Sequence, residues 1–248
     1  MIVAAVICTP SKMYALFDVV DAIQQMPQVD RVYINIEGWW DVDAQRVSFL
    51  DLFGKEWGWT KPIDWDRWLV ASTTWREETT GDQDMTRIPS IVTARNMCID
   101  YAMLHEADHL LFIDADVIPL PSGLSYLLEL DVPLCGGLVP GRGAHSHVNY
   151  LFGGRTELRP NVTECAHGTC GYMLIHKTIF GIQRFRWGPN PKYPDDPPLT
   201  EDPAYCYDYT ARTSRRFVIH SLARAKHIDD PLNPLTAEGA YDGYQARD

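Results

Sequence analysis

The chain has 248 residues, of which 46% are hydrophobic and 22% are charged, a composition typical of a globular protein rather than a disordered one. This length suits one α/β domain with a sizeable core and argues against two large domains. Its 33 acidic and 22 basic side chains give a formal charge of -11, which disfavours bulk binding to nucleic acid or to an anionic membrane. A few arginines inside a cleft could still hold a diphosphate.

Targeting and cysteine signals favour a cytoplasmic protein. The first residues lack the basic leader of a signal peptide, and no apolar run approaches the roughly 18 to 20 residues that a membrane span requires. The six cysteines show no CxxC spacing, so we expect buried thiols in a reducing compartment rather than disulfides.

The first 36 residues predict a βαβ unit. An apolar, β-branched run over Ile2–Ile7 is typical of a central parallel strand that is buried on both faces. Helically spaced apolar residues follow over Met13–Met26, where Pro27 ends the run, and a second strand is expected over Val32–Ile36.

A tryptophan-rich segment interrupts this pattern. Seven of the eight tryptophans lie between Gly38 and Trp75, a region that also predicts a short strand over Trp68–Ala71 and leads into a polar loop over Thr73–Thr86. Two interpretations remain open. The aromatic side chains could form the local core of an insertion, or they could form a wall on which a sugar or a base stacks.

The rest of the chain continues the alternation of helices and strands. We expect helices from Ser90 to Met103, from Pro121 to Leu130 and from Thr200 to Arg212, and strands over His109–Ile113, Pro133–Gly137, Gly171–His176 and Phe217–His220. This order predicts a Rossmann-like α/β fold, in which helices flank a mostly parallel sheet. We expect one domain over residues 1–228, made of the halves 1–118 and 119–228, and a polar tail over 229–248.

Two acidic residues, Asp114 and Asp116, come directly after the strand expected over His109–Ile113. Residues two apart on an extended chain point to the same side, so both carboxylates can enter the crevice beyond the strand ends, where open α/β sheets bind ligands. Close carboxylates repel each other unless a cation or protons neutralise them, and their oxygens suit Mg²⁺ or Mn²⁺ shared with a diphosphate. The alternative is a solvated turn that caps the next helix.

Three further motifs stand in a fixed order around this acidic pair. Ala94-Arg95-Asn96 precedes the strand HLLFI, Thr200-Glu201-Asp202 precedes the strand RFVIH, and Ala225-Lys226-His227 comes last. From about Pro89 to Ile228, this order resembles the glycosyltransferase A enzymes, especially the inverting family-two type. The resemblance implies transfer of a sugar from a nucleotide-sugar donor to a hydroxyl acceptor, with donor binding in the half 1–118 and acceptor binding in the half 119–228. Inversion is expected, although retaining members share the acidic strand motif.

The resemblance also implies a metal site. Asp116 would bind Mn²⁺ or Mg²⁺ directly, Asp114 would contact the ribose or reach the metal through water, and His227 would complete the protein ligands, with His220 as a nearby alternative. The metal would act as a Lewis acid that neutralises charge on the departing nucleoside diphosphate.

The catalytic residues implied are the acidic pair at the start of the helix expected from Thr200. Asp202 would be the general base, since the helix macrodipole keeps a carboxylate ionised there and able to take the acceptor's hydroxyl proton. Glu201 is the adjacent alternative, or it orients the acceptor. Ordinary acidic capping of a first helical turn would also explain both residues.

Donor contacts are implied at positions spread along the first half. The donor would lie over Asp114-Ala115-Asp116, and Arg95 would pair with a phosphate or a base carbonyl unless it is a helix-surface arginine. Thr9 and Glu37, after the first two strands, would contact the nucleoside. The chain lacks the Asp-Asp-Gly-Ser type of turn that is usual after the second strand, so the nucleotide stays open.

A glycine-rich segment over Gly136–Gly143 is typical of a mobile loop near a ligand, and its Arg142 could meet phosphates or sugar hydroxyls. A plain flexible loop explains the segment equally well.

Two other functions are weighed against sugar transfer. A nucleotidyltransferase on a related fold also needs carboxylate-held Mg²⁺, but it carries a glycine-rich basic loop after its first strand, where this chain has only Lys12. A non-catalytic, tryptophan-rich carbohydrate-binding protein would leave the acidic motifs without a common purpose. The acceptor is left open among polysaccharide, lipid-linked, protein and small-molecule hydroxyls; a modified DNA base is disfavoured by the acidic charge.

Overall fold

The computed structural model describes residues 1–8, 12–37, 67–73, 83–140, 156–191, 198–228 and 235–236. Thr9, Arg142 and most of the tail 229–248 lie outside these residues, as do the tryptophans of the 39–75 segment apart from Trp68. Within the described ranges, no helix is long and apolar enough to cross a membrane.

One sheet organises the described residues. Its strands are β1 (Ile2–Cys8), β2 (Arg31–Glu37), β3 (Trp68–Thr73), β4 (His109–Asp114), β5 (Val117–Pro119), β6 (Leu134–Leu138), β7 (Thr156–Arg159), β8 (Val162–Cys165), β9 (Tyr172–His176), β10 (Phe217–His227) and β11 (Leu235–Thr236). They follow the order β3-β2-β1-β4-β9-β6-β10-β8-β7, and β5 and β11 pair with β10.

The sheet is mixed. β3, β2, β1 and β4 form a parallel block, and β6 and β10 are also parallel to each other. β9 runs antiparallel between β4 and β6 and joins the two halves of the chain in one sheet. With helices on both faces, this architecture confirms the predicted Rossmann-like α/β fold class.

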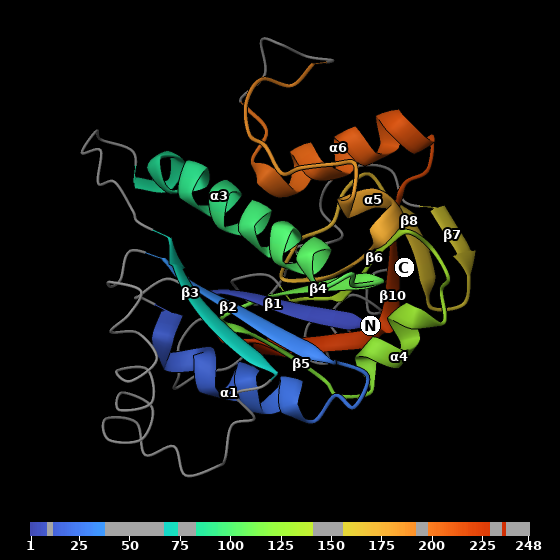
Figure 1. The fold of residues 1–248 in the computed structure, drawn as a ribbon. Coiled ribbons are helices and arrows are strands. Elements are labelled where there is room, and N and C mark those ends of the chain that lie inside the picture. Colours follow the sequence, from blue (N-terminus) through green and yellow to red (C-terminus); the bar gives the residue numbers. More distant parts are fainter. Residues whose placement is uncertain are drawn as a thin grey trace, which may run out of the picture.

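The helices lie in two layers around the sheet (Figure 1). They are α1 (Met13–Gln24), α3 (Gln83–Leu104), α4 (Gly123–Leu128), α5 (Lys177–Phe180) and α6 (Glu201–Thr213). Apolar residues of α1 and α4 fill the core on one face, and those of α3, α5 and α6 fill the core on the other. β1 contributes side chains to both cores, because successive side chains of a strand point to opposite faces. Ala4 and Val6 pack in the core with α1 and α4, and Val3 and Ala5 pack in the core with α3, α5 and α6.

Helix α3 starts earlier than the sequence indicates. It begins at Gln83, so the predicted N-cap at Ser90 is wrong, and Pro89 lies inside the helix. A proline weakens the turn in which it lies, because it has no N–H and its ring crowds a carbonyl, but the residues before it can still be helical. The predicted part of the helix, which carries Arg95, is confirmed.

Strand β10 is longer than predicted. It extends past His220 to His227, because β6 and β8 pair with its first half and β5 and β11 pair with its end. Neighbouring strands satisfy the backbone groups of this extension, and β5, β6 and β8 come from distant parts of the sequence. As a result, His227 is the last residue of a strand and not part of a loop.

Gly136 and Gly137 belong to β6, which confirms the strand predicted over Pro133–Gly137; the mobile loop predicted over Gly136–Gly143 does not include these two residues. A Cβ at Gly137 would lie 2.2 Å from the Ala223 carbonyl oxygen and 2.2 Å from the Tyr172 ring. A Cβ at Gly136 would lie 2.6 Å from the ring of Phe217. Glycine is required here because neighbouring strands and aromatic rings pack closely against the backbone.

Candidate active site

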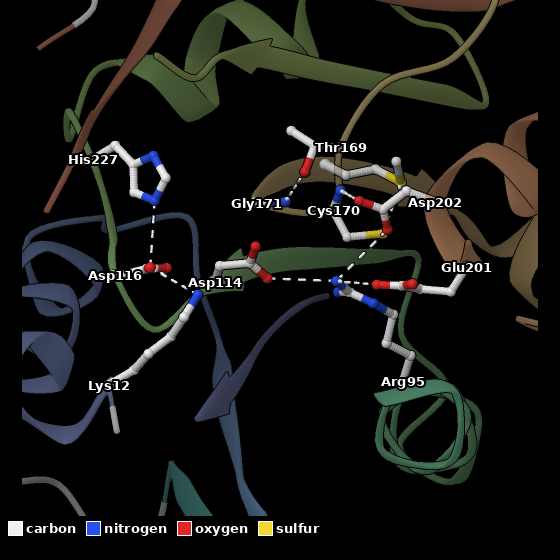
Figure 2. Close-up of polar contacts among 11 residues, drawn as sticks. Lys12, Arg95, Asp114, Asp116, Thr169, Cys170, Gly171, Glu201, Asp202 and His227 are labelled. Atoms are coloured by element: carbon white, nitrogen blue, oxygen red, sulfur yellow. Dashed lines mark hydrogen bonds and ion pairs between the residues drawn. The ribbon is translucent and has the colours of Figure 1, made fainter. Parts of the chain in front are cut away.

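The candidate site lies at the carboxyl ends of β1 and β4, the edge at which open α/β sheets bind ligands. Asp114 is the last residue of β4, and Lys12 lies between β1 and α1. α6 begins with Glu201 and Asp202, whose side chains point toward Arg95, which also contacts Asp114 (Figure 2). The site therefore combines groups from both halves of the chain.

Backbone pairing holds Asp116 against His227. β5 pairs antiparallel with the end of β10, so that Val117 lies opposite His227. The Ile228 N–H donates to the Asp116 carbonyl oxygen at 2.8 Å. As a consequence, His227 Nε2 lies 3.3 Å from Asp116 Oδ2, although the two residues are 111 positions apart (Figure 2).

The His227 ring has a defined orientation. Its Nδ1 lies 2.9 Å from the Pro140 carbonyl oxygen, which can only accept a hydrogen bond, so Nδ1 carries a proton. In the protonated ring, Nε2 donates a hydrogen bond to Asp116; in the neutral ring, Nε2 has a lone pair that can bind a cation held by the same carboxylate. A nitrogen and a carboxylate oxygen that face each other across 3.3 Å suit a divalent cation of the Mn²⁺ type, which accepts both kinds of ligand. Among the described residues, however, no group of three or more His, Cys, Asp or Glu side chains could hold a metal ion.

Lys12 supplies a positive charge to the same carboxylate. Its Nζ lies 2.7 Å from Asp116 Oδ2, and the Asp116 side chain is only 2% exposed. Burial acts to raise the pKa of Asp116, but the hydrogen bond with His227 and the Lys12 ammonium outweigh it and hold that pKa below its usual value. Asp116 is therefore an ionised, buried carboxylate.

Arg95 is the centre of a second group of charges. The residue is 4% exposed, and two phenylalanine rings flank its guanidinium. Its Nη2 lies 3.5 Å from Asp114 Oδ1, 3.5 Å from Glu201 Oε1 and 3.6 Å from Asp202 Oδ1. Three carboxylates thus share one cation, which leaves the group with excess negative charge when all three are ionised.

The excess negative charge affects the pKa of Glu201. Burial, together with the charge of Asp202, raises the pKa of Glu201 to about 7, although Arg95 opposes the change. Glu201 is consequently a mixture of protonated and ionised forms near neutral pH, and it can either donate or accept a hydrogen bond there.

Asp202 is oriented by the loop before β9. Its Oδ2 accepts a hydrogen bond from the Cys170 N–H at 3.0 Å. Its Oδ1 is buried and has no hydrogen-bond partner among the described residues. This oxygen has an ion pair with Arg95 Nη2 at 3.6 Å but no hydrogen bond within the described part of the chain, so it can still accept one from a substrate.

Comparisons with known proteins rest on structure alone, since the sequence matches no protein-family model and no curated protein. One similar solved structure is the mannosyltransferase PcManGT from Pyrobaculum calidifontis in complex with GDP-Man and Mn²⁺. The match has a TM-score of 0.52 and 10% identity, and it covers 89% of this chain and 54% of that one. Another is glucosyl-3-phosphoglycerate synthase from Mycobacterium tuberculosis in complex with Mn²⁺, UDP and phosphoglyceric acid. Here the TM-score is 0.51 and the identity 14%, and the match covers 94% of this chain and 72% of that one.

The chain has the glycosyltransferase A fold. Within that fold, the predicted site residues that the structure brings together form two neighbouring groups: Asp116 with His227, and Arg95 with Asp114, Glu201 and Asp202. Ala115 lies between the two groups and is fully buried.

Four predicted site residues remain: Thr9, Glu37, Arg142 and His220. Glu37 ends β2, but its side chain lies outside the described part of the structure, as do Thr9 and Arg142 as whole residues. His220, the alternative to His227, stacks on the ring of Tyr126 with 5.1 Å between ring centroids. Of these two histidines, His227 contacts Asp116.

Sequence reasoning missed the role of Lys12, which it treated only as an isolated basic residue. A usable signal was present in the strand order. β1 and β4 are parallel neighbours with Ile7 opposite Asp114, so the residues that follow both strands emerge at one edge. A cation shortly after β1 therefore lies near the acidic residues after β4.

Proposed function

We propose that this chain is a glycosyltransferase that moves a sugar from a nucleotide-sugar donor to a hydroxyl acceptor, with inversion at the anomeric carbon. The observation that carries the proposal is the meeting of two groups at one edge of the sheet. The pair Asp116 and His227 fits the donor's metal, and the acidic start of α6 fits the acceptor. Only Ala115 separates the two groups along β4 and its following turn.

On the donor side, Asp116 and His227 would hold Mn²⁺ or Mg²⁺, with further ligands from the donor diphosphate and water. When bound, the metal supplies positive charge that stabilises the departing nucleoside diphosphate. The Pro140 carbonyl keeps His227 Nε2 directed at this position. Asp114, with a side chain that is 28% exposed, is accessible to the ribose of the donor.

On the acceptor side, Asp202 would be the general base. Its Oδ2 is fixed by the Cys170 N–H, and its Oδ1 has acceptor capacity left for the incoming hydroxyl. Removal of that proton would raise the nucleophilicity of the acceptor oxygen as it attacks the anomeric carbon. Glu201, with a pKa of about 7, would orient the acceptor through a hydrogen bond.

Arg95 would hold the carboxylates of the site in position and would not contact the donor. It is buried, and its guanidinium already contacts the carboxylates of Asp114, Glu201 and Asp202. We therefore assign it a positioning role in place of the phosphate contact implied by the resemblance. It connects the donor-side acid to the pair at the start of α6.

The identities of the donor nucleotide and of the acceptor have to be measured. The mannosyltransferase structure holds GDP-Man, whereas the synthase structure holds UDP and phosphoglyceric acid, so proteins of this fold use different nucleotides. The test is a calorimetric titration of the full chain with a panel of nucleoside diphosphates, with and without Mn²⁺. We expect one nucleotide to bind only in the presence of Mn²⁺.

Two variants give this titration its specificity. Asp116→Asn should abolish the Mn²⁺-dependent binding, since it removes a charged ligand but keeps the shape of the side chain. Asp131→Asn is the matched control, because Asp131 is exposed, has φ = 49° and lies outside the site, and asparagine tolerates that backbone conformation equally well. Absence of binding by the unmodified chain under every condition would refute the proposed function.

A further inference from the structure

The carboxylate of Asp116 already has a cation from its own chain. Lys12 Nζ lies 2.7 Å from Asp116 Oδ2, the same oxygen that faces His227 Nε2 at 3.3 Å (Figure 2). The ammonium thus lies beside the two groups that fit a metal ion.

A divalent cation and the Lys12 ammonium cannot both stay at Asp116 without strong repulsion, because like charges a few ångströms apart in a partly buried site are poorly screened. Asp116 cannot move aside easily. Its side chain is buried, and its carbonyl oxygen accepts the Ile228 N–H in the pairing between β5 and β10.

Lys12 is the partner that can move. Its side chain is 23% exposed, and the four-carbon stem of a lysine allows the ammonium several positions. Leaving Asp116 uncompensated would be unfavourable, so the ammonium should leave when another positive charge arrives. A donor diphosphate bound at the same edge would offer the released ammonium a new anionic partner.

We propose that Lys12 is a resident cation that competes with the divalent metal for Asp116 and transfers to the diphosphate when the donor binds. This inference rests on the proposed function and deepens it. Metal alone binds weakly, because it must displace Lys12, whereas metal and nucleoside diphosphate together bind cooperatively. Each ligand increases the affinity for the other by the same factor, as thermodynamic linkage demands.

The test measures free Mn²⁺ by electron paramagnetic resonance during titration of the full chain, first without and then with the nucleoside diphosphate identified above. Lys12→Met keeps most of the stem but removes the charge. We expect it to tighten binding of Mn²⁺ alone by about tenfold, the size of effect reasonable for losing one competing ion pair, and to reduce the enhancement by the nucleotide.

Two control variants separate the charge from general effects. Lys12→Arg retains the cation and should keep the weak Mn²⁺ binding of the unmodified chain. Lys177→Met removes a lysine that forms an ion pair with Asp108 at 2.7 Å, outside the site, and should leave Mn²⁺ binding unchanged.

The outcomes distinguish this inference from the proposed function. If the unmodified chain binds no nucleoside diphosphate with Mn²⁺, the proposed function fails and this inference fails with it. If nucleotide binding depends on Mn²⁺ but Lys12→Met binds Mn²⁺ alone no more tightly than the unmodified chain, the inference about Lys12 is overturned and the proposed function stands.

Discussion

Replacement of Glu201 with glutamine tests the electrostatics of the candidate site. In the folded chain, burial raises the pKa of Glu201 from an ordinary 4.5 to about 7, the charge of Asp202 adds to the effect, and Arg95 opposes it. Glutamine has nearly the shape of the protonated acid but does not ionise. Glu201→Gln should therefore stabilise the protein wherever the native glutamate would have to carry a charge.

The pH dependence has a definite sign. Between pH 4.5 and about 7, the unfolded chain has released the Glu201 proton while the folded chain retains it, so the stability of the unmodified protein falls as pH rises through this window. At about 1.4 kcal/mol per pKa unit, the difference is worth about 3 kcal/mol above pH 7. Glu201→Gln lacks this loss, so its advantage should grow from about 1 kcal/mol at about pH 5 to about 3 kcal/mol at about pH 8.

Urea unfolding of both proteins at about pH 5 and about pH 8 measures this difference directly. Glu157→Gln, on the exposed strand β7, is the matched control, and its effect on stability should be the same at both pH values. The reasoning would be refuted by a stability difference between Glu201→Gln and the unmodified protein that does not change with pH. A difference that reverses sign would show that Arg95 stabilises the ionised glutamate more than burial destabilises it.

Three other predictions test the packing of the site and its supports. Arg95→Met should lower the free energy of unfolding by about 3 to 5 kcal/mol in urea titrations at neutral pH, because it leaves three partly buried carboxylates without their shared cation. Gly137→Ala should lower it by about 3 kcal/mol or more, because the new methyl group would lie 2.2 Å from the Ala223 carbonyl oxygen, whereas Gly171→Ala, with its nearest contact at 3.4 Å, should be tolerated. All six cysteines are buried, so a water-soluble thiol reagent should modify them only as fast as the chain unfolds, and rapid modification in the native state would contradict this structure.

The parts of the fold that could be predicted are those whose signals are local. The apolar run of β1 and the strand before Asp114 are buried on both faces, and their composition alone indicates this. The start of α6 was also predictable, since Thr200 precedes an acidic first turn. These elements fix the edge of the sheet at which the candidate site lies.

The parts that could not be predicted depend on partners distant in the sequence. β9 inserts antiparallel between β4 and β6, and its position brings Cys170 next to Asp202, a contact with no local signal. The extension of β10 to His227 depends on pairing with β5, a strand of three residues that is too short to be recognised from periodicity. Sequence order suggested that His227 and Asp116 meet, but this pairing is what brings them together.

The source of the neutralising charge is the point on which sequence and structure differ most. Repulsion between Asp114 and Asp116 predicts that cations lie nearby, and the structure places Arg95 beside the first and Lys12 beside the second. The repulsion argument alone therefore does not require a metal, because side chains of the same chain meet the demand. The case for a metal rests instead on His227, whose oriented Nε2 faces a buried carboxylate that Lys12 can leave. A metal that binds without an anion must displace Lys12 from Asp116. A metal that binds together with a diphosphate offers the lysine a new anionic partner. Donor binding would therefore make the metal site accessible.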